Sequence, residues 1–142
     1  MKKLLALSLC FISLGCIVGV NLKTPEETVK TWVRSYNDRD VEGMYVTLSK
    51  SYIFGSGGEE QVRADIKSML EDAREQNITY KIKSIGQLAL PKEEDHPPLV
   101  DIYLLKMDKE YTENGEKKTE EIILNFKMEK EDDKYKIAEY WD

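Results

Sequence analysis

The spacing of hydrophobic residues changes once along this chain, near Asn77, and this change restricts the fold more than any other feature of the sequence. Before Asn77, apolar residues recur at i, i+3 and i+4, which is typical of helices with one buried face. After it, apolar and polar residues alternate, which is typical of strands. Helices followed by a run of strands predict an α+β domain, with the helices on one face of an antiparallel sheet.

Three helices are predicted in the first part. The first begins at Thr24-Pro25-Glu26-Glu27, where Thr24 caps, Pro25 takes the first helical position and Glu27 completes a capping box. The break Asn37-Asp38-Arg39-Asp40 ends it, and Asp40 caps a second helix. A third runs from about Glu59 to Gln76. The predicted inward residues are Val29, Trp32, Val33 and Tyr36, then Val41, Met44, Tyr45 and Leu48, then Val62, Ile66, Met69, Leu70 and Ala73.

Two long strands, Leu99 to Thr112 and Lys117 to Lys130, flank Asn114-Gly115. Asn-Gly is the strongest short hairpin signal, because both residues tolerate the positive φ of a type I′ turn. A two-residue turn there pairs apolar residues with one another along one face. The predicted pairs are Tyr103 with Phe126, Leu105 with Leu124, and Met107 with Ile122.

Two further strands complete a sheet of about four. One starts at Ile78, and its alternation slips near Ser84-Ile85, as a β-bulge would cause. The other runs from Tyr135 to Trp141, after a turn at Asp132-Asp133.

The segment Thr24-Pro25-Glu26-Glu27, followed by Trp32 and by Tyr36-Asn37-Asp38-Arg39-Asp40-Val41-Glu42-Gly43-Met44, resembles the start of nuclear-transport-factor-2-like domains. This superfamily of cystatin-like cones includes SnoaL-type and ketosteroid-isomerase-like proteins. The resemblance covers residues 24–142 and implies three helices on a curved antiparallel sheet, with an apolar cleft. It extends to small lipoproteins of Gram-positive bacteria that carry this domain. Enzymes and non-enzymes share the fold, so it implies little about activity.

The isomerase branch allows one test of activity. Its chemistry uses an Asp as base and a Tyr as hydrogen-bond donor. Aligned on the shared break, this chain has Ser56 at the aspartate position and Trp32 at the tyrosine position. Because a serine does not act as that base, we expect a non-catalytic domain.

The first residues resemble a bacterial lipoprotein signal. Lys2 and Lys3 precede an apolar run from Leu4 to Gly15 that is too short for a membrane span of about 20 residues. The ending Ile12-Ser13-Leu14-Gly15-Cys16 resembles a lipobox, with Ser13 where Leu is usual and the small Gly15 before the cut. A plain secretory signal cleaved near Gly15, and an uncleaved anchor, are the alternatives.

A lipobox predicts three parts: a signal peptide over residues 1–15, a lipidated Cys16 with a tether over residues 16–23, and one domain over residues 24–142. Two or more acyl chains hold a protein stably on a membrane. We therefore expect a protein anchored on the extracytoplasmic face of the cell membrane. Cys10 leaves with the signal and Cys16 carries lipid, so the mature domain has no disulfide and no cysteine metal site.

Charge and histidine content exclude other classes. The net charge is −6, and loss of Lys2 and Lys3 makes the mature chain more acidic, so nucleic acid is not an expected partner. His96 is the only histidine, which rules out a multi-histidine metal site. No cofactor or metal is predicted.

The aromatic set suggests a candidate pocket. Its six residues are Trp32, Tyr36, Tyr45, Tyr80, Tyr103 and Phe126. At these spacings such residues are more often core than ligand contacts, but an apolar cleft is the default binding site. The expected function is a non-catalytic module that binds a small apolar ligand or an envelope protein. The alternatives are a dimerising domain, if Leu104 and Ile123 share an exposed sheet face, and a SnoaL-like enzyme on a small apolar substrate.

Overall fold

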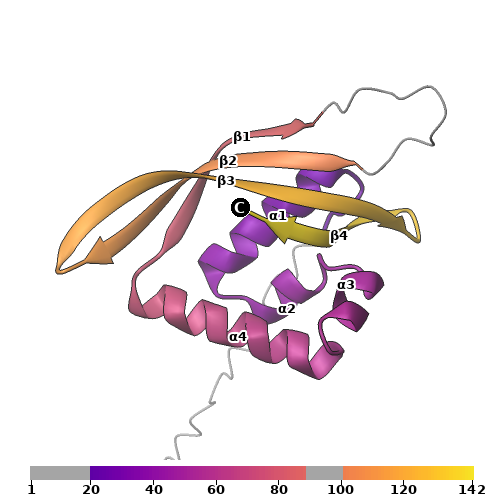
Figure 1. Ribbon diagram of the computed structural model, residues 1–142, viewed down its shortest axis with the longest axis horizontal. Helices are drawn as coiled ribbons and strands as arrows, with labels where there is room; N and C mark the ends of the chain where they lie inside the picture. The colour runs from indigo at the N-terminus through magenta and orange to yellow at the C-terminus, as the bar shows by residue number, and fades with distance from the viewer. Residues whose placement is uncertain (1–19, 89–100) are drawn as a thin grey trace, which may run out of the picture.

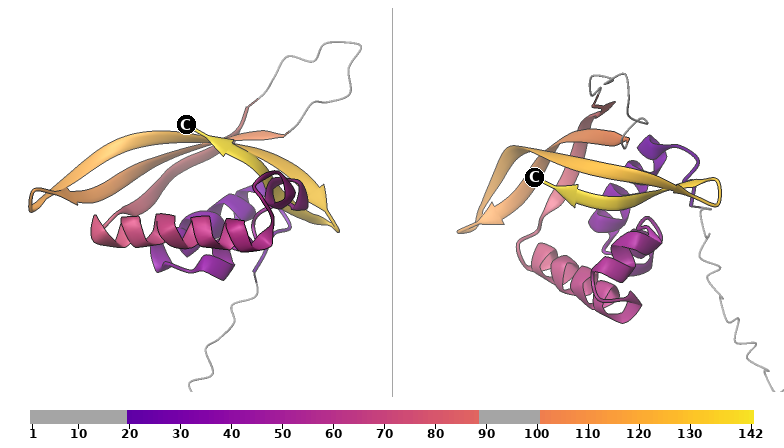
Figure 2. Two further views of the ribbon diagram at one scale, coloured as in Figure 1. Left: turned by 60° about the horizontal axis from the view of Figure 1, so that its bottom comes forward. Right: turned by 45° about the vertical axis from the view of Figure 1, so that its right-hand side comes forward.

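The helices and the sheet form two layers, as the computed structural model shows for residues 20–88 and 101–142 (Figure 1). The helices are α1 (Pro25–Asp38), α2 (Val41–Tyr45), α3 (Lys50–Gly55) and α4 (Glu59–Glu75). The strands are β1 (Thr79–Gln87), β2 (Ile102–Glu113), β3 (Glu116–Glu131) and β4 (Lys134–Trp141). The sheet is an antiparallel meander in the order β1-β2-β3-β4, curved over the helices, which all lie on its concave face (Figure 2). The α+β prediction is confirmed.

The Thr24 cap and the position of Pro25 at the start of α1 are as predicted, whereas the Glu27 carboxylate pairs with Lys30 at 3.4 Å. The Thr24 hydroxyl accepts a hydrogen bond from the Glu27 amide at 3.2 Å, with Pro25 in the first turn. The helix ends at Arg39, whose φ of 59° is left-handed. The Arg39 guanidinium donates to the carbonyls of Ala73 and Ile78, and so joins the end of α1 to the end of α4 and the start of β1.

Gly43 is required by a close approach inside the helical break. Asp40 caps α2 by accepting the Gly43 amide at 2.9 Å. A Cβ at Gly43 would overlap the Asp40 carboxylate and the Ser35 hydroxyl. The Asp-Val-Glu-Gly motif is therefore a packing device that lets α2 fold back against α1.

The predicted hairpin register is confirmed. β2 pairs with β3 so that Tyr103 faces Phe126, Leu105 faces Leu124 and Met107 faces Ile122. Both turn residues have positive φ, 53° at Asn114 and 78° at Gly115, as a type I′ turn requires. The outer end of this hairpin reaches past the helices (Figure 1).

The bulge and the last turn are confirmed as well. The register of β1 shifts between Ile82 and Ser84, next to the predicted position. Asp132 and Asp133 both have positive φ and connect β3 to β4.

The helix α3 is the main departure from the sequence analysis, which predicted no separate helix between the one capped by Asp40 and the one that begins at about Glu59. Ser49 caps it by accepting the Tyr52 amide at 3.1 Å. The Glu131 carboxylate, at the far end of β3, accepts the Lys50 amide at 2.7 Å. A carboxylate distant in sequence thus satisfies an amide that the first turn of a helix leaves without a partner.

The core lies between α1 and the middle of the sheet. Its most deeply buried members are Val29, Met44, Leu105, Met107, Phe126 and Ile137. The buried hydrophobic residues of the described chain fall between Leu22 and Ile137, and Leu22 joins the fold by accepting the Tyr135 amide at 2.9 Å. A chain that starts at residue 20 therefore retains this core.

Candidate functional site

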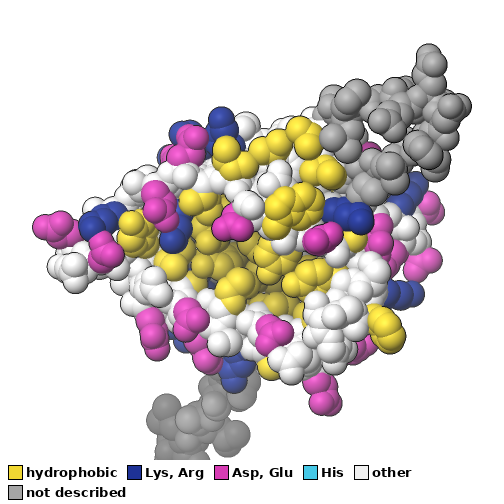
Figure 3. Space-filling view, viewed as in Figure 1, with side chains coloured by type: hydrophobic (Ala, Val, Ile, Leu, Met, Phe, Trp, Pro, Cys, Tyr) yellow, Lys and Arg dark blue, Asp and Glu magenta, His cyan; other side chains and the backbone are white. Residues whose placement is uncertain are grey.

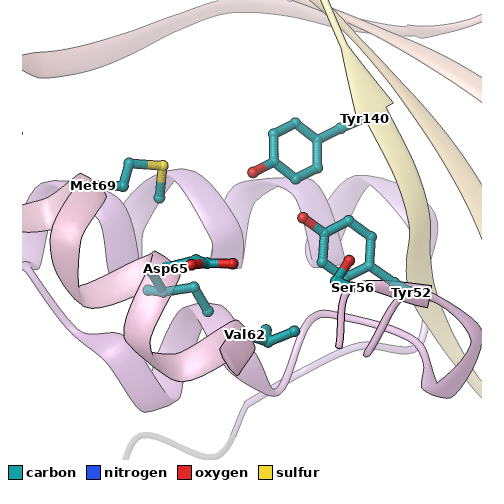
Figure 4. A pocket seen from close by; sticks show the side chains of 7 residues that line it. Tyr52, Ser56, Val62, Asp65, Met69 and Tyr140 are labelled. Atoms are coloured by element: carbon teal, nitrogen blue, oxygen red, sulfur yellow. The ribbon is translucent and has the colours of Figure 1, made fainter. Parts of the chain in front are cut away.

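A cavity of about 90 Å³ lies where α3, α4 and β4 meet (Figure 4). Figure 3 shows hydrophobic side chains gathered in the hollow between the sheet and α4, with charged side chains around it. The cavity is lined by Tyr52, Ser56, Val62, Asp65, Ile66, Met69 and Tyr140.

One face of α4 forms the floor of the cavity. Val62, Asp65, Ile66 and Met69 follow the spacing i, i+3, i+4, i+7, which puts them on one side of a helix. Val62 and Ile66 are buried. Asp65 is thus an acidic residue within an otherwise apolar stripe, and its Oδ1 accepts the Gln61 side-chain amide at 2.7 Å.

Two tyrosines form the opposite wall. The rings of Tyr52 and Tyr140 stack with centroids 5.9 Å apart and planes 16° apart. Both hydroxyls point into the space above α4, toward the side of the cavity that holds Asp65 and Ser56 (Figure 4). Four oxygen-bearing side chains therefore surround one small space with an apolar floor.

Tyr140 belongs to the core through its ring and to the cavity through its hydroxyl. Its ring packs against Trp32 at 5.5 Å and Phe126 at 6.0 Å between centroids. Burial raises the pKa of Tyr140 above its ordinary 10.0, and neighbouring Tyr52 and Asp65 add to the rise. The phenol is therefore neutral at physiological pH and both donates and accepts hydrogen bonds.

A second, open groove of about 550 Å³ runs between α2, α3 and the end of β3. Phe54 projects from its edge with 89% of its surface exposed. Lys136 also lines it and donates to the Val46 carbonyl, while burial lowers the pKa of its ammonium group. This groove mixes both signs of charge, with Lys50 and Lys136 beside Glu59 and Glu131.

None of the six aromatic residues predicted for the pocket lines the cavity between α3, α4 and β4. Trp32, Tyr36, Tyr103 and Phe126 are buried in the core, at 3%, 4%, 7% and 0% exposure. Tyr80 is half-buried and packs against Tyr36, with ring centroids 4.5 Å apart and planes tilted by 31°. Tyr45 lines the second groove, where the Arg63 guanidinium lies 3.6 Å over its ring. Trp32 and Phe126 do not line the cavity, but both pack against the ring of Tyr140, which does.

The residues that do line the cavity were largely missed, although one signal was readable. Asp65 interrupts the apolar face of the third predicted helix, between Val62 and Met69. Ser56, considered only as a replacement for a catalytic aspartate, does line the cavity. Trp32, considered as a replacement for the tyrosine, does not.

Several sequence predictions fall outside the described residues. Gly15, Cys16 and His96 belong to this group. Within residues 20–88 and 101–142, no helix is both long and apolar enough to cross a membrane. In the same residues, no group of three or more His, Cys, Asp or Glu side chains is arranged to hold a metal ion.

The outer face of the sheet carries the apolar pair considered for dimerisation. Leu104 and Ile123 lie on neighbouring strands, on the side opposite to buried Leu105 and Phe126. Ile123 is 42% exposed and Leu104 is half-buried. Trp141, paired with Asn125, adds a third apolar side chain at 38% exposure.

Comparison with known proteins gives structural matches only. No family model matches the chain, and no curated protein sequence matches it. Aln2 from a Streptomyces species is similar in structure, with a TM-score of 0.57 at 10% identity, over 84% of this chain and 91% of that one.

Two larger proteins contain a similar domain. Bd1075 from Bdellovibrio bacteriovorus matches with a TM-score of 0.51 at 13% identity. The helical cell shape determining protein Pgp2 from Campylobacter jejuni matches at 0.52 and 18% identity. The matches take in 82% and 81% of this chain but only 37% and 38% of those proteins. The matches show a shared fold, and helices on one face of a four-stranded antiparallel sheet are consistent with the nuclear-transport-factor-2-like, or cystatin-like, arrangement that the sequence predicts. At these identities, the matches carry no information about activity.

Proposed function

We propose that this domain binds a small ligand in the cavity between α3, α4 and β4, without catalysing a reaction, on the extracytoplasmic face of a membrane. The observation that supports it most is the meeting of four oxygen-bearing side chains over an apolar floor, from Tyr52, Ser56, Asp65 and Tyr140. Binding sites of this kind combine an apolar lining with a few placed polar groups.

The proposed anchor is a lipid on Cys16. It is supported by the basic start, the short apolar run and Gly15 before the cysteine. A stretch from Cys16 to Leu22 spans at most roughly 20 Å when fully extended. Since the Leu22 carbonyl is hydrogen-bonded to the Tyr135 amide of β4, a lipidated chain would hold the domain close to the membrane surface.

Ligand binding is tested by native mass spectrometry of the protein extracted from its own host in mild detergent. We expect a retained mass beyond that of the lipidated chain. Ser56→Phe should remove this mass by filling the mouth of the cavity. The matched control is Ser68→Phe, the same change at an exposed position of α4, which should keep it. A wild-type protein that carries no added mass would argue against a bound ligand.

The anchor has a separate test. Cells fed a radioactive fatty acid should label the wild-type protein but not Cys16→Ala. Equal labelling of the two, or no labelling of either, would show that Cys16 is not acylated.

An enzymatic role is the second candidate, because a carboxylate and a neutral phenol share the cavity. Asp65 as base and Tyr140 as hydrogen-bond donor would suit proton transfer on a small apolar substrate. The exposure of Asp65 argues against this role, since a base is made effective at neutral pH by burial. Turnover of a retained ligand by the wild type, but not by Asp65→Asn, would support it.

A dimerising role is the third candidate, supported by the apolar outer face around Leu104, Ile123 and Trp141. Light scattering after size exclusion tests it. A dimer that becomes a monomer in Ile123→Lys would favour this role, and a monomer at high concentration would oppose it.

A further inference from the structure

We propose that the cavity between α3, α4 and β4 takes a primary ammonium group on a short alkyl chain. The inference deepens the ligand-binding function proposed above and rests on it. Three properties of the cavity support it: the charge of the lining, the kind of polar atoms in it, and its size.

The charge of the lining favours a cation. Of the seven lining residues, Asp65 alone has a side chain that is charged at neutral pH, and it is negative. The nearby Arg63 is held elsewhere, since its guanidinium donates to Glu42 at 2.8 Å and Glu59 at 3.3 Å and lies over the Tyr45 ring. An anionic ligand would therefore meet a carboxylate with no opposing positive group in the lining.

The polar side-chain atoms of the lining residues are all oxygens. They belong to the hydroxyls of Tyr52, Ser56 and Tyr140 and the carboxylate of Asp65. The Asp65 Oδ1 already accepts from Gln61, which leaves Oδ2 for a ligand. Every one of these oxygens accepts hydrogen bonds, and a primary ammonium supplies three donors on one atom. A quaternary ammonium has no N–H group and would leave these acceptors without partners.

The size of the cavity limits the length of the alkyl chain attached to the ammonium group. The cavity of about 90 Å³ is small beside the roughly 300–1,000 Å³ of pockets that hold drug-sized ligands. Val62, Ile66 and Met69 offer an apolar surface for a short methylene chain. Any larger part of the ligand would extend through the mouth of the cavity into solvent.

The test uses residues 16–142 with Cys16→Ser, a chain that keeps the described core. Butylammonium, tetramethylammonium, butyrate and butanol are titrated at constant ionic strength while backbone amide resonances are followed by NMR. We expect butylammonium to shift the Tyr52, Asp65 and Tyr140 resonances to saturation. Tetramethylammonium should bind at least several-fold more weakly, and butyrate should leave these resonances unmoved.

Asp65→Asn should weaken butylammonium binding about ten-fold or more. Glu71→Gln is the matched control, because it also removes one negative charge from an exposed position of α4 but lies outside the cavity lining. It should bind butylammonium as the wild type does. Unchanged affinity in Asp65→Asn, or an equal loss in Glu71→Gln, would overturn the assignment.

The probes also separate this inference from the function on which it rests. If butanol or butyrate shifts the cavity resonances and butylammonium does not, ligand binding stands and the ammonium assignment is wrong. If no probe shifts them and the native protein retains no ligand, both proposals are wrong.

Discussion

Aromatic side chains gather in two regions of this domain, with opposite consequences. Under the middle of the sheet, Trp32 and Phe126 pack edge to face, 5.4 Å apart, and are closed to solvent. Between β4 and α4, Tyr52 and Tyr140 also pack together, but their hydroxyls border a cavity. The neighbours differ: the first pair lies within the buried hydrophobic core, whereas Asp65 and Ser56 share the space of the second. An aromatic residue marks a binding site here only where polar groups accompany it.

The largest effect should come from the closed region. Phe126→Ala removes a side chain with no exposed surface, so it should lower the free energy of unfolding by about 3–5 kcal/mol. Urea denaturation followed by tryptophan fluorescence measures this change. A loss below about 1 kcal/mol would mean that the region under the sheet is not closely packed.

Sequence reasoning succeeded in the region that depends on local signals. The register of Tyr103 with Phe126 follows from an Asn-Gly turn and from alternation, both of which are visible within one hairpin. The capped start of α1 is equally local. These signals fix the closed core.

The cavity depends on contacts that no local pattern contains. The Lys50 amide, at the start of the helix that carries Tyr52, donates a hydrogen bond to Glu131, 81 residues further along the chain. Tyr140 faces inward because the register of β3 with β4 shifts between Lys127 and Met128. Strict alternation from buried Ile137 would turn Tyr140 to the outer face instead. Of the polar residues in the cavity, only Asp65 could be singled out from the sequence, as a charge within an apolar stripe.

The next largest effect on stability should come from a polar clamp, the two hydrogen bonds between the Asn37 side chain and the Tyr80 backbone. The Asn37 side-chain amide donates to the Tyr80 carbonyl at 2.8 Å, and its oxygen accepts the Tyr80 amide at 2.8 Å. Asn37→Ala leaves two backbone groups without these partners and should cost about 2 kcal/mol of unfolding free energy. The adjacent, exposed Asp38→Ala is the control and should change it by less than about 0.5 kcal/mol. Equal effects in the two variants would rule out a specific clamp.

Acid should destabilise α3, which borders the cavity, before it destabilises the core under the sheet. Burial acts to raise the pKa of Glu129, but hydrogen bonds from Ser51 and Ser49 outweigh it and lower the pKa below its ordinary value. A carboxyl with a lower pKa in the folded state stabilises the fold above about pH 4.5, and this contribution is lost as the pH falls through the folded value. Glu129→Gln should therefore cost about 1 kcal/mol at pH 7 and little at pH 3.

Denaturation of both proteins between pH 7 and pH 3 measures this difference. Glu116→Gln, at an exposed position of the same strand, should leave the pH profile unchanged. Because Ser51 lies in the helix that carries Tyr52, the protection of α3 amides from exchange, relative to their intrinsic exchange rate at each pH, should fall on acidification before that of β2 amides does. A simultaneous loss of protection in both elements would show that Glu129 does not hold α3 separately.

The smallest effect on stability should come from Asp65 itself. It is exposed, and its hydrogen bond from Gln61 is a surface contact within one helix, so Asp65→Asn should change the unfolding free energy by less than about 0.5 kcal/mol. Its buried neighbour Ile66, changed to Ala, should cost about 2–5 kcal/mol and sets the scale. If Asp65→Asn instead costs more than about 1 kcal/mol, the carboxylate supports the packing of α4, and the cavity is part of the core. A negligible cost combined with a loss of ligand would show that this carboxylate serves binding, because nothing in the stability of the fold depends on it.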